Sequence, residues 1–131
     1  MQSGDVRALN REVFRSVYSD AYLQRYRRAF QMLEGEGTAE EVRRFGVLVE
    51  ACRECDPYDA LDAIDCPVLA IGSLHDRTLS PCGMTELAEK LGCELYMYDD
   101  YGHALNDEAP DFKQRVANFF TAAPQLQRRG I

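Results

Sequence analysis

The chain has 131 residues, of which 46% are hydrophobic and 28% are charged, and these shares are typical of one ordered globular domain. Its formal net charge of -7 disfavours nucleic-acid binding, because the phosphate backbone is also negative. The first residues lack the apolar centre of a secretory signal, and no stretch is long and apolar enough to cross a membrane. We therefore predict a soluble, cytoplasmic protein that binds neither nucleic acid nor membranes.

The amino-terminal part has the spacing of α-helices. Over residues 6–33, apolar side chains recur at steps of three and four, and the polar pair at 19–20 is a place where this helix can break in two. Thr38 and Glu41 have the spacing of a capping box, which opens another helix. That helix is predicted to run to about Cys52.

The cysteines are odd in number and scattered, which predicts free thiols in a reducing compartment rather than a disulfide framework. They are Cys52, Cys55, Cys66, Cys82 and Cys93. Cys52 and Cys55 form a Cys-x-x-Cys motif, but a zinc site needs a second close pair of ligands that the sequence lacks. A redox pair would begin a helix after a strand, whereas this motif falls late in a helix, so it stays a weaker hypothesis. We predict no metal and no cofactor.

From Pro67 onward the pattern changes to alternating strands and helices. Residues 68–72 form an apolar run that predicts a strand buried on both faces, and residues 94–98 predict a second strand. Between them, Ser80-Pro81 is a helix-start signal and Gly92 is placed to end that helix. This order predicts two parallel strands joined by a right-handed crossover.

A last helix is predicted to follow the second strand. It should point Phe112, Val116, Phe119 and Phe120 inward and stop before Pro124. The predicted fold class is therefore α/β, with helices first and then a short parallel sheet with its crossover and terminal helices. We divide the chain into a helical region, 1–59, and an α/β segment, 60–131.

Asp76 and His103 are the candidate catalytic residues. Each follows the carboxyl end of a predicted parallel strand, and such loops converge on one edge of a sheet. A carboxylate that accepts a hydrogen bond from one imidazole nitrogen leaves the other nitrogen free to take a proton from a nucleophile. Gly102, directly before His103, allows a sharp turn beside the ring. The sequence thus predicts an acid–base pair within hydrogen-bond or one-water distance.

Three other polar or aromatic groups have simpler interpretations. His75 is predicted to be an exposed residue. Tyr18, Tyr22 and Tyr26 share a helical face and can line a pocket, although such a stripe more often packs into a core. The acidic cluster of Asp99, Asp100, Asp107 and Glu108 has no loop pattern for a divalent cation and is predicted to be solvated charge.

The two segments IDCPVLAIGSLHDRTLSP and ELYMYDDYGHALNDEAPDFKQRVANFF, with a helix between them, resemble the carboxyl-terminal part of an α/β-hydrolase. The resemblance covers residues 60–121. It implies that Asp76 matches the catalytic acid of that family and His103 its catalytic base. It also implies that the helical region, 1–59, takes the place of a cap or lid.

The family's nucleophile is the feature that this sequence lacks. It lies in a Gly-x-Ser-x-Gly elbow between a strand and a helix, and no such pattern occurs here. The serines are Ser3, Ser16, Ser19, Ser73 and Ser80. Ser73 follows Gly72, but its strand already leads to Asp76, so we interpret it as a loop residue. The oxyanion donors would lie with the missing elbow.

Two functional hypotheses follow. The first is a truncated hydrolase part, inactive alone, that carries the acid and histidine of a Ser-His-Asp triad of the esterase or lipase kind. It would act on a small ester-like substrate once a nucleophile-bearing half is present. The alternative is a non-catalytic module that self-associates or binds a protein partner. A two-stranded sheet leaves unpaired edges, so both hypotheses predict a homo-oligomer, most simply a dimer.

Overall fold

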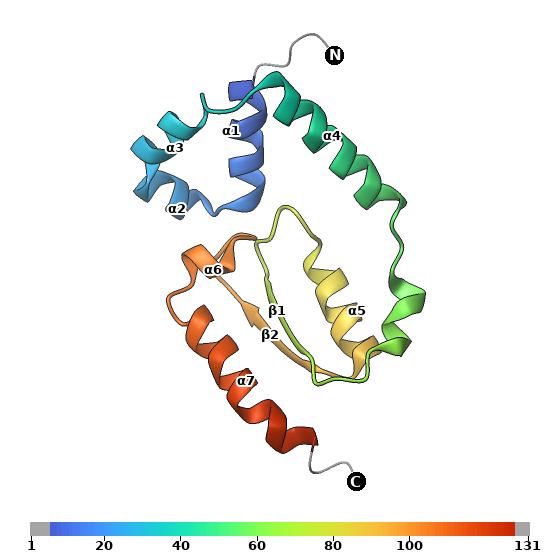
Figure 1. The fold of residues 1–131 in the computed structure, drawn as a ribbon. Helices are drawn as coiled ribbons and strands as arrows, with labels where there is room; N and C mark the ends of the chain where they lie inside the picture. Colours follow the sequence, from blue (N-terminus) through green and yellow to red (C-terminus); the bar gives the residue numbers. More distant parts are fainter. Residues whose placement is uncertain (1–5, 128–131) are drawn as a thin grey trace.

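The computed structural model describes residues 6–127 as a mixed α/β chain that is mostly helical (Figure 1). In chain order the elements are α1 Val6–Val17, α2 Asp20–Arg25, α3 Arg27–Leu33, α4 Ala39–Glu54, the 3-10 helix η1 Tyr58–Ala63, β1 Leu69–Ser73, α5 Pro81–Leu91, β2 Glu94–Tyr98, α6 Leu105–Glu108 and α7 Phe112–Gln127. The predicted order of helices followed by strand, helix, strand and helix is confirmed. The short elements η1 and α6 were not predicted.

Local capping signals set the boundaries of the amino-terminal helices. The break predicted at 19–20 is confirmed, because Ser19 is the N-cap of α2 and its hydroxyl accepts the Tyr22 N–H at 3.2 Å. The capping box is also confirmed, with Glu41 N–H donating to Thr38 Oγ1 at 3.2 Å. A second break at Tyr26, which separates α2 from α3, was not predicted.

The sheet consists of two parallel strands connected through α5. Leu69 pairs with Glu94 at one end of the register, and Ser73 pairs with Tyr98 at the other. The two strand predictions are confirmed, the first within one residue. α5 begins at Pro81 and ends at Leu91. Its C-cap is Gly92, whose φ of 58° is the left-handed conformation that glycine adopts without strain.

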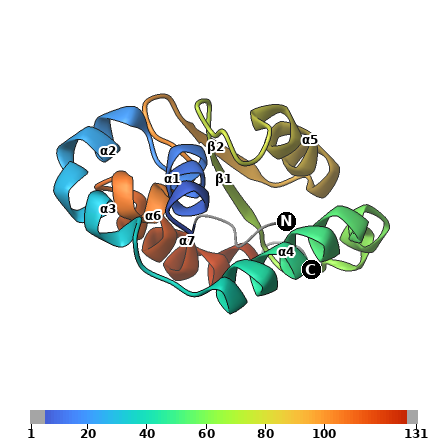
Figure 2. The ribbon, with the colours of Figure 1, turned by 90° about the horizontal axis from the view of Figure 1, so that it is seen from above.

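The crossover helix and the last helix cover opposite faces of the sheet, as Figures 1 and 2 both show. On the α5 face, Gly72 is so close to Met84 and Met97 that a Cβ would lie 2.9 Å from Met84 Cγ. On the α7 face, the Arg115 guanidinium lies 3.3 Å from the centre of the Tyr96 ring. The alternation of side chains along each strand therefore divides the core into two thin layers.

Two predictions for the last helix are wrong. α7 does not stop before Pro124 but continues to Gln127, and Phe120 points outward with 69% of its surface exposed. Proline lacks an N–H, so within α7 it removes one backbone hydrogen bond, but its fixed φ is itself helical. Because Pro124 lies within the last turn, few backbone bonds depend on it.

The chain leaves an unusually large surface exposed. Its accessible surface is 10000 Å², whereas a compact monomer of 14.9 kDa exposes about 7,000 Å². The strand predicted to be buried on both faces is buried only in part, since Leu69 and Ile71 are half-buried. The buried hydrophobic residues in the described part are Ala70, Ala88, Tyr98, Ala104, Leu105 and Ala109. Little of the core is thus fully enclosed.

Within residues 6–127, no helix combines the length and the apolar character needed to cross a membrane.

Candidate functional site

Asp76 and His103 meet at the carboxyl edge of the sheet. His103 Nδ1 lies 2.8 Å from Asp76 Oδ2, at the distance of a direct hydrogen bond. Asp76 follows β1 and His103 follows β2, so the parallel pairing of the two strands brings their loops together. The predicted contact between these two side chains is therefore present.

The Asp76 carboxylate is held on both of its oxygens. Its Oδ1 accepts the backbone N–H groups of Thr78 at 2.7 Å and Leu79 at 2.8 Å, while Oδ2 faces His103. Burial acts to raise the pKa of this carboxyl, but the hydrogen bonds from Leu79, His103 and Thr78 outweigh it and leave the pKa below its usual value. Asp76 is therefore kept as an ionised, acceptor-only group.

The ionised partner fixes the role of each imidazole nitrogen. A carboxylate cannot donate, so His103 Nδ1 carries the hydrogen and donates it to Asp76. Nε2 then keeps its lone pair and can accept a proton. The His103 side chain is 37% exposed, whereas that of Asp76 is 11% exposed. The pair therefore has a half-buried acid and an exposed base that solvent can reach.

Three serines of the described part have hydrogen-bond partners other than His103. Ser73 is buried, and its hydroxyl donates to the Tyr101 carbonyl while accepting the His75 N–H at 3.2 Å. Ser16 donates to the Val13 carbonyl at 2.9 Å, and Ser19 donates to Glu108. Within residues 6–127, no serine hydroxyl forms a hydrogen bond with the His103 ring; Ser3 lies outside this range.

The interpretation of the acidic cluster as solvated charge is wrong for Glu108, whereas Asp107 is exposed but has one long-range partner. Glu108 Oε1 accepts the N–H groups of Ser19 at 2.9 Å and Gly102 at 3.2 Å. Asp107 accepts the Tyr18 hydroxyl at 3.0 Å, and burial together with this carboxylate raises the pKa of Tyr18 to about 12. Sequence spacing gave no sign of the contacts with Ser19 and Tyr18, because both join residues 89 positions apart in the chain.

The tyrosine stripe packs on itself. The rings of Tyr18 and Tyr22 stack with centroids 5.2 Å apart, and those of Tyr22 and Tyr26 lie 4.6 Å apart. Phe14 and Phe30 complete this aromatic cluster. None of the three tyrosines lines any of the five main hollows in the described part, so packing within this cluster accounts for the stripe.

A hollow of about 420 Å³ lies on the Asp76 side of the pair. Its lining residues are Ser19, Asp20, Ala21, Leu74, His75, Asp76, Arg77 and Asp100. His75 is exposed there, as predicted. His103 does not line this hollow, so the hollow is not the place where His103 Nε2 would act.

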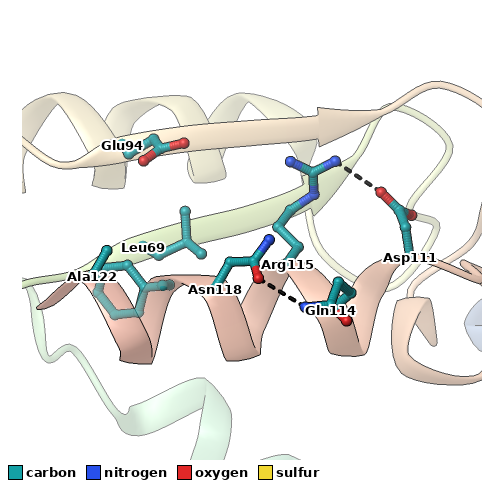
Figure 3. A pocket seen from close by; sticks show the side chains of 8 residues that line it. Leu69, Glu94, Asp111, Gln114, Arg115, Asn118 and Ala122 are labelled. Atoms are coloured by element: carbon teal, nitrogen blue, oxygen red, sulfur yellow. Dashed lines mark hydrogen bonds and ion pairs between the residues drawn. The ribbon is translucent and has the colours of Figure 1, made fainter.

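A second hollow, of about 320 Å³, lies between the sheet and α7 (Figure 3). It includes Leu69 and Glu94, which are the first residues of their strands, so it opens at the end of the sheet opposite Asp76 and His103. Its Arg115 donates to Asp111 at 2.8 Å, as the dashed line in Figure 3 shows. These polar groups pair with one another and do not extend the candidate site.

The cysteines lie apart from the Asp76–His103 contact and form no disulfide in the described part. All five are free thiols, and Cys52 and Cys55 are exposed near the end of α4. In the described part, no group of three or more His, Cys, Asp or Glu side chains is arranged to hold a metal ion.

Comparisons with family models, with curated proteins and with solved structures gave no match to this chain.

Proposed function

We propose that Asp76 and His103 are the acid and base of a serine hydrolase of the α/β-hydrolase type, whose nucleophilic serine comes from polypeptide outside this sequence. The observation that carries the proposal is the 2.8 Å contact between His103 Nδ1 and the ionised Asp76 carboxylate. It supports the proposal because it combines the spacing, the ionisation state and the strand-end position that a triad requires.

The pair has a defined part in such chemistry. Nε2 of His103 would take the proton of an attacking serine hydroxyl, and Asp76 would stabilise the imidazolium that forms. His103 would then return the proton to the leaving alcohol of an ester-like substrate. The helical region before residue 60 would act as the cap over this site, and its α1–α2 junction already lies beside both site loops.

The test is to express the gene together with the coding sequence upstream of it and to treat the product with a serine-directed fluorophosphonate. We expect one labelled serine outside the present 131 residues, and we expect His103→Ala and Asp76→Asn to abolish its labelling. His75→Ala is the matched control, because the His75 ring is also exposed but forms no hydrogen bond with the Asp76 carboxylate. Labelling that is unchanged in His103→Ala, or the absence of a reactive serine in the longer product, would refute the proposal.

A second candidate function, self-association, is favoured by a separate observation. Phe45, Leu48 and Val49 lie on one face of α4, since residues three and four apart share a helical face, and they are 41%, 64% and 41% exposed. The accessible surface of 10000 Å² also exceeds the roughly 7,000 Å² expected of a compact monomer of this mass. We propose that a second copy of this chain covers the stripe. The mass of the protein in solution tests this proposal.

A further inference from the structure

Residues 15–20, which run from the last turn of α1 to the first residue of α2, lie against both loops of the candidate site. We call this segment the junction. Figure 1 shows the end of α1 and the start of α2 next to the segment that leads from β2 into α6. The junction is far from both loops in the sequence, so its contacts with them are purely tertiary.

The junction holds His103 from the residue before it and the residue after it. Glu108 Oε1 accepts the N–H of Ser19 at 2.9 Å and that of the buried Gly102 at 3.2 Å, so one carboxylate joins the junction to the backbone before His103. On the other side, the Ala104 N–H donates to the Val17 carbonyl at 3.1 Å. The backbone of His103 is therefore fixed at both of its peptide neighbours.

The junction holds the Asp76 loop in the same way. Arg77 Nη1 donates to the Arg15 carbonyl at 3.2 Å and to Asp20 Oδ1 at 2.9 Å. Thr78 Oγ1 donates to the Ser16 carbonyl at 3.0 Å. Both residues come directly after Asp76, so the same short segment sets the position of the two loops relative to each other.

We infer that the junction is a positioning element for the Asp76–His103 pair, and that Glu108 is the positioning residue through which it orients His103. Glu108 is the side chain that bonds the junction and the His103 loop at once, and bonds from N–H groups to a carboxylate are among the stronger ones. A hydrogen bond between side chains tolerates only about 0.5 Å of displacement in a working site. The catalytic importance of Glu108 rests on the proposed function, whereas its effect on the position of His103 does not.

The experiment follows the imidazole nitrogens of the ¹⁵N-labelled full chain by NMR at about pH 9, where an ordinary histidine is neutral. The chain has two histidines, so His75 serves as an internal reference. We expect the unchanged protein to show the Nδ1–H tautomer at His103. Glu108→Ala should lose the Nδ1-bound proton signal and move both ring nitrogens towards an average of the two tautomers, while His75 stays unchanged.

Two variants separate positioning from general damage. Glu108→Gln keeps an amide oxygen that can accept from Gly102 and Ser19, so it should restore the His103 spectrum. Asp107→Asn removes the charge of the neighbouring carboxylate but keeps a side-chain oxygen that can accept from Tyr18, so it should leave the junction in place and the His103 spectrum unchanged. A folded Glu108→Ala protein with the His103 spectrum of the unchanged protein would overturn the inference.

Amide hydrogen exchange in the unchanged protein keeps the inference testable if Glu108→Ala does not fold. The N–H groups of Ser19 and Gly102 share one acceptor, so both should be protected and to a similar degree. A freely exchanging Gly102 amide would overturn the inference. Neither readout needs hydrolysis, so a failed fluorophosphonate experiment with an altered His103 spectrum in Glu108→Ala would refute the hydrolase and leave the positioning role intact.

Discussion

Gly102 packs directly against the backbone of Val17. A Cβ at position 102 would lie 2.7 Å from the Val17 carbonyl oxygen and 2.8 Å from the Ser19 nitrogen. Gly102 does not have a positive φ, so the turn before His103 does not itself require glycine. Glycine is needed here because the junction approaches the His103 loop too closely to leave room for a side chain.

Gly102→Ala should therefore destabilise the protein. The atoms that a methyl group would meet belong to the backbone, which cannot move aside as a flexible side chain can, and such overpacking costs about 1–3 kcal/mol. Gly46→Ala is the control, because a Cβ there meets nothing within 4 Å in the middle of α4. It should raise the free energy of unfolding by about 0.5–1 kcal/mol. Urea unfolding of both variants measures the two effects, and equal stability of the variants would contradict this account.

Asp76 should make the stability of the protein depend on pH in the acid range. Its pKa is lowered in the folded state, so its contribution is present above the unfolded aspartate pKa of about 3.9 and is lost as the pH falls through the lower folded value. Asp76→Asn should be less stable than the unchanged protein at pH 6, and the difference should close as the pH falls below about 4. Asp59→Asn, on the exposed η1, is the control. A pH-independent difference in unfolding free energy would show that ionisation of Asp76 does not matter.

The 131-residue chain by itself should neither hydrolyse esters beyond a His103→Ala control nor react with a fluorophosphonate. The reason is that Ser73, which is the last residue of β1 and not the loop residue we predicted, is buried with its hydroxyl donated to the Tyr101 carbonyl. Loss of a nucleophile and of oxyanion donors removes most of the rate enhancement of triad enzymes. Mass spectrometry after labelling and a p-nitrophenyl acetate assay check this. One fluorophosphonate per chain would show that a serine of this chain is the nucleophile.

The sequence predicted the features that depend on local chemistry. Pro81 and Gly92 correctly predicted the two ends of α5. The rule that loops after parallel strands converge correctly predicted that Asp76 and His103 lie together. These signals are read within one turn or one strand of the chain.

Features that depend on tertiary approach were missed. Glu108 was interpreted as solvated charge because its contact with Ser19 is set by how α1 and α2 lie on the site loops. The role of Gly102 was assigned to the turn for the same reason. The contact of Glu108 with Gly102, six residues earlier, belongs to an irregular turn for which we used no spacing rule. The rule that proline ends a helix failed at Pro124. Only three residues of α7 follow it, so the loss of one backbone hydrogen bond there costs little.

The last prediction concerns the exposed stripe on α4. If a second copy covers it, light scattering coupled to size exclusion should give twice the mass of the 14.9 kDa chain. Obligate dimers bury about 2,000–5,000 Å² in total, so the interface should extend beyond the stripe to the surface around it. A twofold dimer would place the same stripe of both chains against itself.

Two substitutions on adjacent residues make this prediction specific to one face of the helix. Leu48 and Val47 are 64% and 58% exposed, but consecutive helical residues are about 100° apart, and Val47 lies away from the face of Phe45 and Val49. Leu48→Glu should therefore yield the mass of one chain, because a carboxylate would be buried without a partner. Val47→Glu adds the same charge to the same helix and should leave the dimer intact. A single-chain mass for the unchanged protein at all concentrations, or dissociation by both variants alike, would exclude the α4 stripe as the interface.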